Sequence, residues 1–350
     1  MVPMEFFGNT PDGGAGKLFT LENSTLRVQI TDYGGRIVSI EAPDRDGRRA
    51  HVVLGFDDVG SYATTEGAFG AILGRTANRI AEGRFTLEGK SYELLRNESC
   101  ATLHGGPQGF ERLFWDVRPD ASSPEPSLLC TLVSPDGDQG YPGELVVQAR
   151  YRLAGDWLWL EFEARTSAAT PVSLSAHPYF NLAGLEAHNV LDHEVQLPAR
   201  HFLPTDAAQI PTGEVRQVEH TPFDFRTPQR LGSRIRQRDE QLLYGHGYDH
   251  YFVLPSRADA SAQFAARAFE PHSGRVLEIY TTQRGLQLYT GNQLNGSVAG
   301  RGGIYRQSAG LALEPQGYPD AENHPHFPSN VIYPNTPYHA LIGYHFGVDR

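Results

Sequence analysis

The sequence predicts an all-β protein built as a large antiparallel β-sandwich with little helix. Many short segments alternate apolar and polar residues with a period of two, the pattern of strands that turn one face to a core and one to water. Turn-forming residues separate these segments. The 350 residues include 37 glycines and 24 prolines, about one residue in six, which disfavours long helices.

The two longest strand candidates are residues 145–153 and 157–164. In the second, the even-numbered positions from 158 to 164 are all apolar and share one face, whereas Trp157 and Trp159 lie on the other face with two glutamates. The two tryptophans are a candidate sugar-stacking platform, but packing under another layer is the preferred interpretation.

Seven shorter segments with strand patterns lie at residues 26–30, 36–40, 85–88, 92–95, 251–254, 276–281 and 286–290. The third and fourth flank Glu88-Gly89-Lys90, which predicts a tight hairpin. Residues 228–243 are the best candidate for a short helix. Since no repeat, low-complexity tract or flexible linker interrupts the pattern, we expect one domain over residues 1–350.

The composition excludes several functions. The formal net charge of −11 argues against a nucleic-acid partner, because phosphate binding requires an excess of basic side chains. No segment has the roughly 18 uninterrupted apolar residues of a membrane helix. The first residues lack a basic region followed by an apolar core, and only Cys100 and Cys130 are present. We therefore expect a soluble cytoplasmic protein with two free thiols.

His177 and Glu314 are the most informative candidates for catalysis. An imidazole and a carboxylate can donate and accept protons on one small molecule at neutral pH. Pro178 favours an extended backbone at His177, so Tyr179 falls on the same face two positions later. The alternative for His177, a core histidine bonded to backbone, has about equal weight from this segment alone.

Two glycine-rich segments supply polar candidates. Asn78 and Arg79 are adjacent and together can donate several hydrogen bonds to the hydroxyls of one ligand. An arginine in a salt bridge between strands is an equally good interpretation of Arg79. His104 precedes two glycines that let backbone approach a ligand, although a plain turn histidine is the commoner situation.

Asp249 and Gln283 offer a carboxylate and an amide for sugar hydroxyls. Asp249 lies at the start of an apolar strand, where capping a turn is the alternative role. A catalytic metal is not expected, because HExxH and CxxC patterns are absent from the sequence. The phosphate-cradling and dinucleotide-binding glycine motifs are also missing, so no cofactor is expected.

Ten segments of the chain, among them residues 103–106 and 177–182, resemble segments of the aldose 1-epimerase family, also called the galactose mutarotases. The second half carries His177-Pro178-Tyr179-Phe180-Asn181-Leu182, and the first half carries Leu103-His104-Gly105-Gly106. Each match is weak alone, but together they form an ordered series along most of the chain, at residues 30–39, 52–57, 74–81, 103–106, 134–143, 177–182, 221–225, 247–250, 289–292 and 313–328.

The resemblance implies a mutarotase-type β-sandwich with its site on a concave sheet face, and interconversion of the α and β anomers of free aldoses without metal or cofactor. It implies that His177 acts as general acid and Glu314 as general base. It also implies sugar-hydroxyl contacts from Asn78, Arg79, His104, Tyr179, Asp249 and Gln283. The family often has Thr-Asn directly before this histidine, where this chain has Ser175-Ala176 and so lacks the amide.

Three other functions are weighed against mutarotation. An epimerase of phosphorylated sugars requires a cationic phosphate pocket, and a non-catalytic sugar-binding module does not require both His177 and Glu314. A glycosidase uses two carboxylates, for which Asp249 and Glu314 are candidates, but then His177 has no role. The expected partner is a monosaccharide; the sequence leaves open which aldose is preferred and whether the protein is a monomer or a homodimer.

Overall fold

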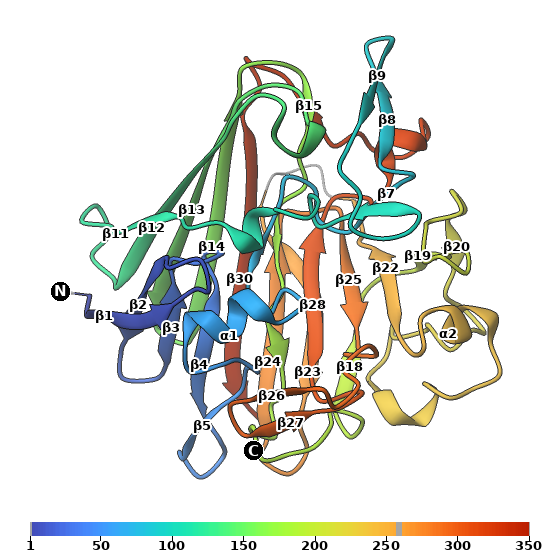
Figure 1. The fold of residues 1–350 in the computed structure, drawn as a ribbon. Helices are drawn as coiled ribbons and strands as arrows, with labels where there is room; N and C mark the ends of the chain where they lie inside the picture. Colours follow the sequence, from blue (N-terminus) through green and yellow to red (C-terminus); the bar gives the residue numbers. More distant parts are fainter. Residues whose placement is uncertain (1, 257–260, 350) are drawn as a thin grey trace.

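The largest sheet has nine antiparallel strands and forms the back of the molecule (Figure 1). The computed structural model describes residues 2–256 and 261–349. In spatial order the strands are β11 (Asp116–Pro119), β12 (Ser127–Ser134), β13 (Leu145–Ala154), β14 (Trp157–Thr166), β30 (Tyr338–Val348), β24 (Arg275–Thr281), β23 (Gln263–Phe269), β18 (Glu194–Gln196) and β21 (Gln229–Arg230).

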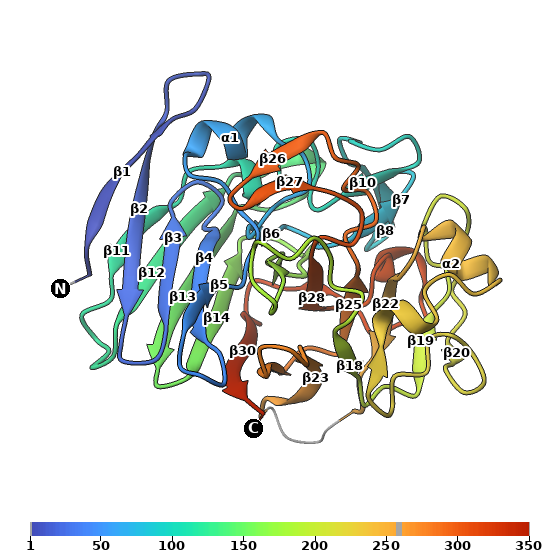
Figure 2. The same cartoon turned by 90° about the horizontal axis from the view of Figure 1, so that it is seen from below.

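Two smaller sheets lie on the nine-stranded sheet (Figure 2). The five-stranded sheet covers the β11–β14 half and has the order β1 (Met4–Asn9), β2 (Ala15–Glu22), β3 (Arg27–Thr31), β4 (Ile37–Pro43) and β5 (Arg49–His51). The six-stranded sheet has the order β17 (Tyr179–Phe180), β28 (Leu311–Gln316), β25 (Gly285–Tyr289), β22 (Asp249–Val253), β19 (His201–Leu203) and β20 (Arg216–Gln217).

Five two-stranded sheets and six short helical segments complete the described chain. The strand pairs are β6 (Ile72–Leu73) with β16 (Ser175–Ala176), β7 (Arg79–Ala81) with β10 (Ala101–Leu103), β8 (Arg84–Leu87) with β9 (Lys90–Glu93), β15 (Thr170–Pro171) with β29 (Val331–Ile332), and β26 (Val298–Gly300) with β27 (Gly303–Tyr305). The helical segments are α1 (Val59–Thr64), α2 (Glu240–Tyr244), and the 3₁₀ turns η1 (Phe110–Arg112), η2 (Asp138–Gly140), η3 (Leu231–Ser233) and η4 (Ala321–Asn323).

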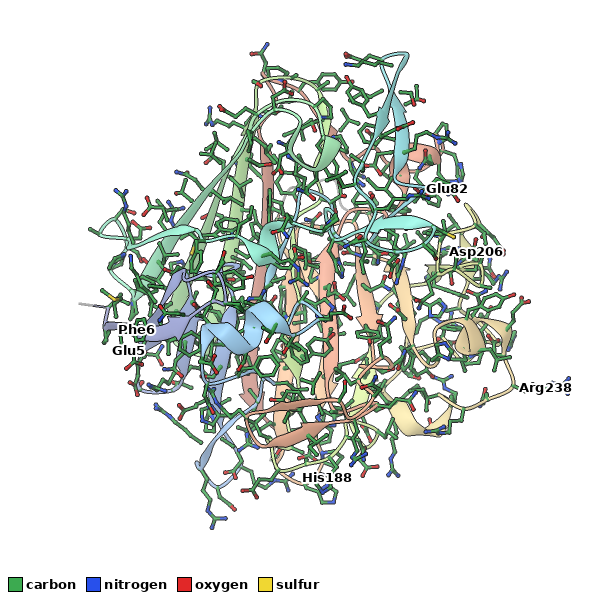
Figure 3. The ribbon with its side chains drawn as sticks, viewed as in Figure 1. Glu5, Phe6, Glu82, His188, Asp206 and Arg238 are labelled. Atoms are coloured by element: carbon green, nitrogen blue, oxygen red, sulfur yellow. The ribbon has the colours of Figure 1, made fainter. Side chains whose placement is uncertain are left out.

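The main core lies where both smaller sheets pack on the large one. Ile30 of the five-stranded sheet, Leu288 of the six-stranded sheet and Phe162 of the nine-stranded sheet are fully buried in one cluster. The Tyr151 hydroxyl also joins two layers, since it donates a 2.8 Å hydrogen bond to the Gly35 carbonyl. Apolar burial of this extent is the main favourable contribution to folding. By contrast, side chains such as Phe6 on the edge strand β1 are exposed (Figure 3).

Strands β22, β25 and β28 are covered on both of their faces. In β25, Leu286 and Leu288 point into the core, whereas Gln287 and Tyr289 point to the opposite side. The same alternation holds for β28, where Leu313 is in the core and Glu314 on the other face. A row of polar side chains is therefore held on one rigid sheet face, and this face forms the floor of the site.

The expected strands are present, with ends shifted by at most three residues. The predicted hairpin is confirmed: Leu87 pairs with Lys90, which leaves Glu88 and Gly89 as a two-residue turn. Both turn residues have positive φ, 52° and 78°, as a type I′ turn requires.

The helix expected over residues 228–243 is wrong for most of that range, because only Glu240–Tyr244 are α-helical. The Leu231 amide donates to His193 and the Gly232 amide to Leu191, so this backbone is bonded to another segment rather than to its own preceding turn. Asp239 then starts the short helix as its N-cap. No helix in the described ranges is long and apolar enough to cross a membrane.

The two tryptophans of β14 pack against each other on the face opposite the core. Their rings are parallel within 4° with centroids 4.7 Å apart, and His345 stacks on Trp157 at 4.4 Å. Both side chains are half-buried. Ring stacking covers the faces of Trp157, so packing is a better interpretation than a sugar platform. The tryptophans pack against each other and His345, and not under another layer as expected.

Candidate active site

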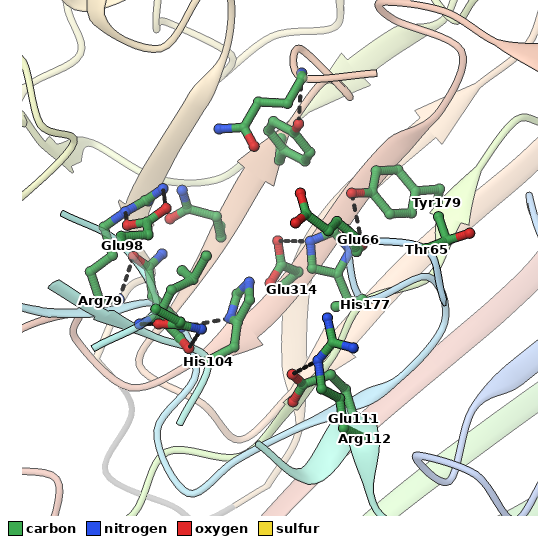
Figure 4. Close-up of a pocket in the computed structure, with 18 of the residues that line it drawn as sticks. Thr65, Glu66, Arg79, Glu98, His104, Glu111, Arg112, His177, Tyr179 and Glu314 are labelled. Atoms are coloured by element: carbon green, nitrogen blue, oxygen red, sulfur yellow. Dashed lines mark hydrogen bonds and ion pairs between the residues drawn. The ribbon is translucent and has the colours of Figure 1, made fainter. Parts of the chain in front are cut away.

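A pocket of about 430 Å³ opens over the face of β17, β28, β25 and β22 (Figure 4). Segments that are far apart in sequence meet there, and the lining is mostly polar. The lining includes Arg36, Asn78, Arg79, Glu98, His104, Glu111, Arg112, His177, Tyr179, Asp249, Gln287, Tyr289 and Glu314.

His177 is held by hydrogen bonds of its own backbone. Its amide donates to Ala71 at 2.9 Å, and its carbonyl accepts from Gly70 at 2.8 Å. Immediately before it, Ser175 and Ala176 form β16, which pairs with β6. The main chain therefore places His177 without the amide side chain that the family often has at the preceding position.

The imidazole of His177 packs among aromatic rings and faces Glu314. Its centroid lies 4.6 Å from that of Tyr179, as expected for two residues on the same face of an extended segment. The Nε2 atom of His177 is 3.6 Å from Oε1 of Glu314. Only 5% of the His177 residue and 2% of Glu314 are exposed. The two side chains, 137 positions apart in sequence, thus share one enclosed pocket.

Burial favours the uncharged form of both groups. It lowers the pKa of His177 to about 4, and the nearby Arg36 guanidinium acts in the same direction. Burial also raises the pKa of Glu314 well above its usual range, assisted by the negative charge of Asp249. The Oε2 atom of Glu314 is buried without a hydrogen-bond partner, which is costly for an ionised carboxylate. Burial therefore disfavours the imidazolium–carboxylate form of the pair relative to the form in which both groups are uncharged.

His104 is a hydrogen-bond donor to the pocket. Its Nδ1 accepts a 3.1 Å hydrogen bond from the backbone N–H of Asn78, so in the neutral ring the proton is on Nε2. The pKa of His104 is lowered well below its usual range, first by burial and then by His177 and Arg79. The φ angle of 52° shows that His104 is also a turn residue, and its contact with a sugar stays a prediction.

Arg79 forms a salt bridge, although its partner Glu98 lies in the loop between β9 and β10 and not in a strand. The contact of Arg79 with a sugar stays a prediction. The Arg79 guanidinium makes a two-point contact with Glu98, with Nε–Oε2 and Nη2–Oε1 distances of 2.7 and 3.0 Å. The same side chain also lines the pocket. The adjacent Asn78 accepts a hydrogen bond from the Arg79 amide with its Oδ1. Asn78 and Arg79 therefore both lie in the pocket wall, next to each other.

Asp249 lies on the pocket face of β22, directly opposite Tyr289 in the sheet register. Its Oδ1 accepts a 2.6 Å hydrogen bond from Gln287, and its Oδ2 a 2.7 Å bond from Gln209. Burial raises the pKa of Asp249, while Arg79 and these two amides oppose the rise. Asp249 is thus a supported carboxylate rather than a turn cap.

Gln283 is the one predicted contact that the structure places elsewhere. Its amide donates hydrogen bonds to the Leu174 carbonyl and the Tyr338 hydroxyl, and it lines a different pocket. Gln287, four residues later, lies opposite Glu314 in the register and on the pocket face. Gln283 lies in the turn before β25, which orients it away from the pocket. Gln287 could have been identified from the sequence, because it alternates with the apolar residues Leu286 and Leu288 and therefore lies on the polar face of the strand.

The side chains of Tyr179 and Arg36 donate their hydrogen bonds to backbone carbonyls. The Tyr179 hydroxyl donates to the Gly67 carbonyl at 3.0 Å, which leaves its ring as the surface that faces the pocket. Arg36, which the sequence did not suggest, donates to the carbonyls of Tyr33 and Phe69 at 3.0 and 2.9 Å. Within residues 2–256 and 261–349, no three His, Cys, Asp or Glu side chains cluster as a metal site would require.

Comparison with known proteins gives a consistent result. Residues 17–345 match the family model described as aldose 1-epimerase. The chain is 44% identical to galactose mutarotase from Bos taurus, with 99% of each chain covered. It is 35% identical to aldose 1-epimerase from Escherichia coli strain K12, with 96% of each covered.

A solved structure shares the same fold. The crystal structure of galactose 1-epimerase from Lactobacillus acidophilus superposes with a TM-score of 0.86 at 26% identity, and all of both chains is covered. The predicted large antiparallel sandwich of the mutarotase type is therefore confirmed.

Proposed function

This chain belongs to the aldose 1-epimerase family and is an isomerase that interconverts the α and β anomers of sugars, and we propose that Glu314 is its general base and His177 its general acid. The observation that supports both roles is the 3.6 Å separation of Nε2 and Oε1 within one pocket. The hydroxyl and the ring oxygen at C1 of a pyranose are bonded to the same carbon, so a donor and an acceptor this close can reach both.

Ring opening moves two protons in opposite directions. Carboxylate Glu314 takes the proton of the C1 hydroxyl, the bond between C1 and the ring oxygen breaks, and imidazolium His177 protonates the ring oxygen. The open-chain aldehyde then turns about the C1–C2 bond. Closure reverses both transfers on the other face of the aldehyde. A positioned acid and a positioned base each typically contribute about 10²- to 10⁴-fold.

The enclosure of the pair assists the opening step. Before opening, the pair is imidazolium and carboxylate; afterwards it is neutral His177 and protonated Glu314. The second state is the one that burial favours, because burial disfavours the charged form of each group. Both states carry the same total number of protons, so the pair acts as a unit.

The other polar residues hold the sugar while C1 turns. Asn78, Arg79 and Asp249 bring donors and a carboxylate to the hydroxyls, and His104 donates from Nε2. Gln287 adds an amide on the same face. Binding energy spent on the unreactive part of the sugar keeps the reacting atoms in place without freezing the bond that rotates.

We propose neutral free hexoses, galactose and glucose, as the substrates. The three arginines of the pocket already have partners: Arg36 has backbone carbonyls, Arg79 has Glu98, and Arg112 lies 3.8 Å from Glu111. A phosphate group would require uncommitted cations. Relatives named galactose mutarotase support galactose in particular.

NMR exchange spectroscopy on the anomeric protons tests the substrate proposal. We expect the protein to accelerate exchange for galactose and glucose, and to leave hexose 6-phosphates near the uncatalysed rate. The same buffer without protein gives the background rate. Equal acceleration for a hexose 6-phosphate would contradict the neutral-sugar assignment.

The pH dependence follows from the single proton of the pair. As the pH falls, Asp249 is protonated. His177, whose pKa is lowered to about 4, is protonated as well, which gives the His177–Glu314 pair a second proton, so kcat/KM decreases. As the pH rises through the raised pKa of Glu314, the pair loses its last proton and kcat/KM decreases again. We expect a bell-shaped profile of kcat/KM in exchange measurements. A rate that keeps rising with pH would indicate a lone carboxylate base and contradict the pair.

We also propose a cytoplasmic location. Both cysteines are unpaired, and Cys100 is only half-buried. Free thiols are typical of a reducing compartment, which supports this location.

A further inference from the structure

The loop between β19 and β20 is a rigid element beside the pocket. Thr205 and Pro211 form an isolated bridge at its base. The Asp206 carboxylate accepts hydrogen bonds from the amides of Ala208 at 2.9 Å and Ile210 at 3.0 Å. Figure 3 shows Asp206 at the periphery of the molecule, on the β19–β20 side. Such side-chain-to-backbone bonds fix a tight turn.

A buried glutamine anchors the base of this loop. The Gln241 amide donates to the Thr205 carbonyl at 2.8 Å, and its oxygen accepts from the Thr205 amide at 2.7 Å. Gln241 lies in α2 and is buried. The loop is therefore fixed at its base and within its turn, so a side chain on it has a defined position.

Gln209 extends from this loop to two residues of the site. Its backbone has a φ of 61°, in the left-handed region that few residues other than glycine adopt. Its Oε1 accepts a 3.2 Å hydrogen bond from Nη2 of Arg79, and its Nε2 donates a 2.7 Å bond to Oδ2 of Asp249. One neutral amide thus bridges a cation and an anion of the pocket wall.

We propose that Gln209 is a positioning residue of the sugar site, which sets Arg79 and Asp249 relative to each other from behind the pocket wall. This inference rests on the proposed function. Gln209 does not line the pocket. Arg79 is also bonded to Glu98, and Asp249 is also bonded to Gln287. Gln209 is bonded to both Arg79 and Asp249 and so links them.

The chemical reason for such a link is the opposite charge of the two residues. A buried guanidinium and a nearby carboxylate attract each other strongly. A direct contact between them would use up the hydrogen-bonding capacity that a sugar requires. The Gln209 amide satisfies one position on each group and keeps the two apart, so both remain available to hydroxyls before the sugar arrives.

Gln209→Met tests the proposal, because it keeps the length of the side chain and removes both hydrogen bonds. We expect KM for galactose to rise roughly tenfold, because Arg79 and Asp249 are no longer held in position for the sugar, with kcat within about twofold of the wild-type value. Gln217→Met is the matched control, since Gln217 is exposed on β20. We expect the control to have the wild-type KM and the same melting temperature.

The pH profile adds a measurement that a purely structural role would not change. Asp249 interacts with Arg79 of β7, with Glu98, with Glu314 of β28 and with Tyr289 of β25. Removing the Gln209 amide takes away a bond to the ionised form of Asp249. The acidic limb of kcat/KM should therefore shift to higher pH in Gln209→Met and stay in place in Gln217→Met.

Two results would overturn the proposal: a KM and an acidic limb equal to those of the control, or a joint loss of kcat and melting temperature with the limb unchanged. Glu314→Gln, measured in the same assay, separates this failure from failure of the proposed function. If Glu314→Gln is inactive and Gln209→Met behaves as wild type, only the role of Gln209 is wrong. If Glu314→Gln retains wild-type exchange, the assignment of the site itself fails.

Discussion

Glu314→Gln is expected to slow anomer exchange by about 10²- to 10⁴-fold, because the amide cannot take the C1 hydroxyl proton. The loss should appear in kcat, since glutamine fills the same space and still hydrogen-bonds a sugar. We expect no loss of stability, because the wild-type carboxyl group has a buried oxygen without a partner. Exchange NMR and a melting curve measure the two effects.

The control for this variant is Glu161→Gln. Glu161 is an exposed residue of β14 that pairs with Arg150 at 3.0 Å. The same chemical change there should leave exchange unaltered, as surface ion pairs contribute little. Near-normal interconversion by Glu314→Gln would show that another group is the base.

His177→Gln is expected to cause a loss of similar size. Its amide can donate a hydrogen bond to the ring oxygen but cannot transfer a proton to it. His339→Gln, at an exposed position of β30, is the control for the chemical change. Because acid and base act in the same step, the double variant should lose little more activity than either single variant.

A double variant whose loss equals the product of the two single losses would contradict a concerted pair. It would indicate that His177 and Glu314 contribute independently to different steps. Unchanged exchange by His177→Gln alone would exclude His177 as the acid and leave His104, whose ring centroid is 5.7 Å from that of His177, as the nearest other imidazole.

Much of the sheet structure could be predicted because alternation with a period of two is a local property. In β13 and β14 every second residue is buried, as their sequences indicate. The expected helix at residues 228–243 failed because bonds to residues 191 and 193 decide the local conformation, and propensity carries no information about such distant partners.

The site could be predicted only in part, for the same reason. The candidate site residues predicted from the sequence line one pocket, apart from Gln283. The register that places Gln287 opposite Glu314 is a long-range feature, and the sequence alone did not indicate it. The preference for uncharged His177 and Glu314 also depends on burial, which reference pKa values do not contain. The single-domain organisation and the individual catalytic roles stay predictions.

The near-complete enclosure of His177 and Glu314 has a consequence for how turnover is completed. Whichever face of the aldehyde is attacked on closure, the two proton transfers are reversed and restore the imidazolium and the carboxylate of the starting state. No buffer molecule has to enter to restore them. The catalyst therefore resets itself with each anomer released, and it serves the forward and backward directions equally well.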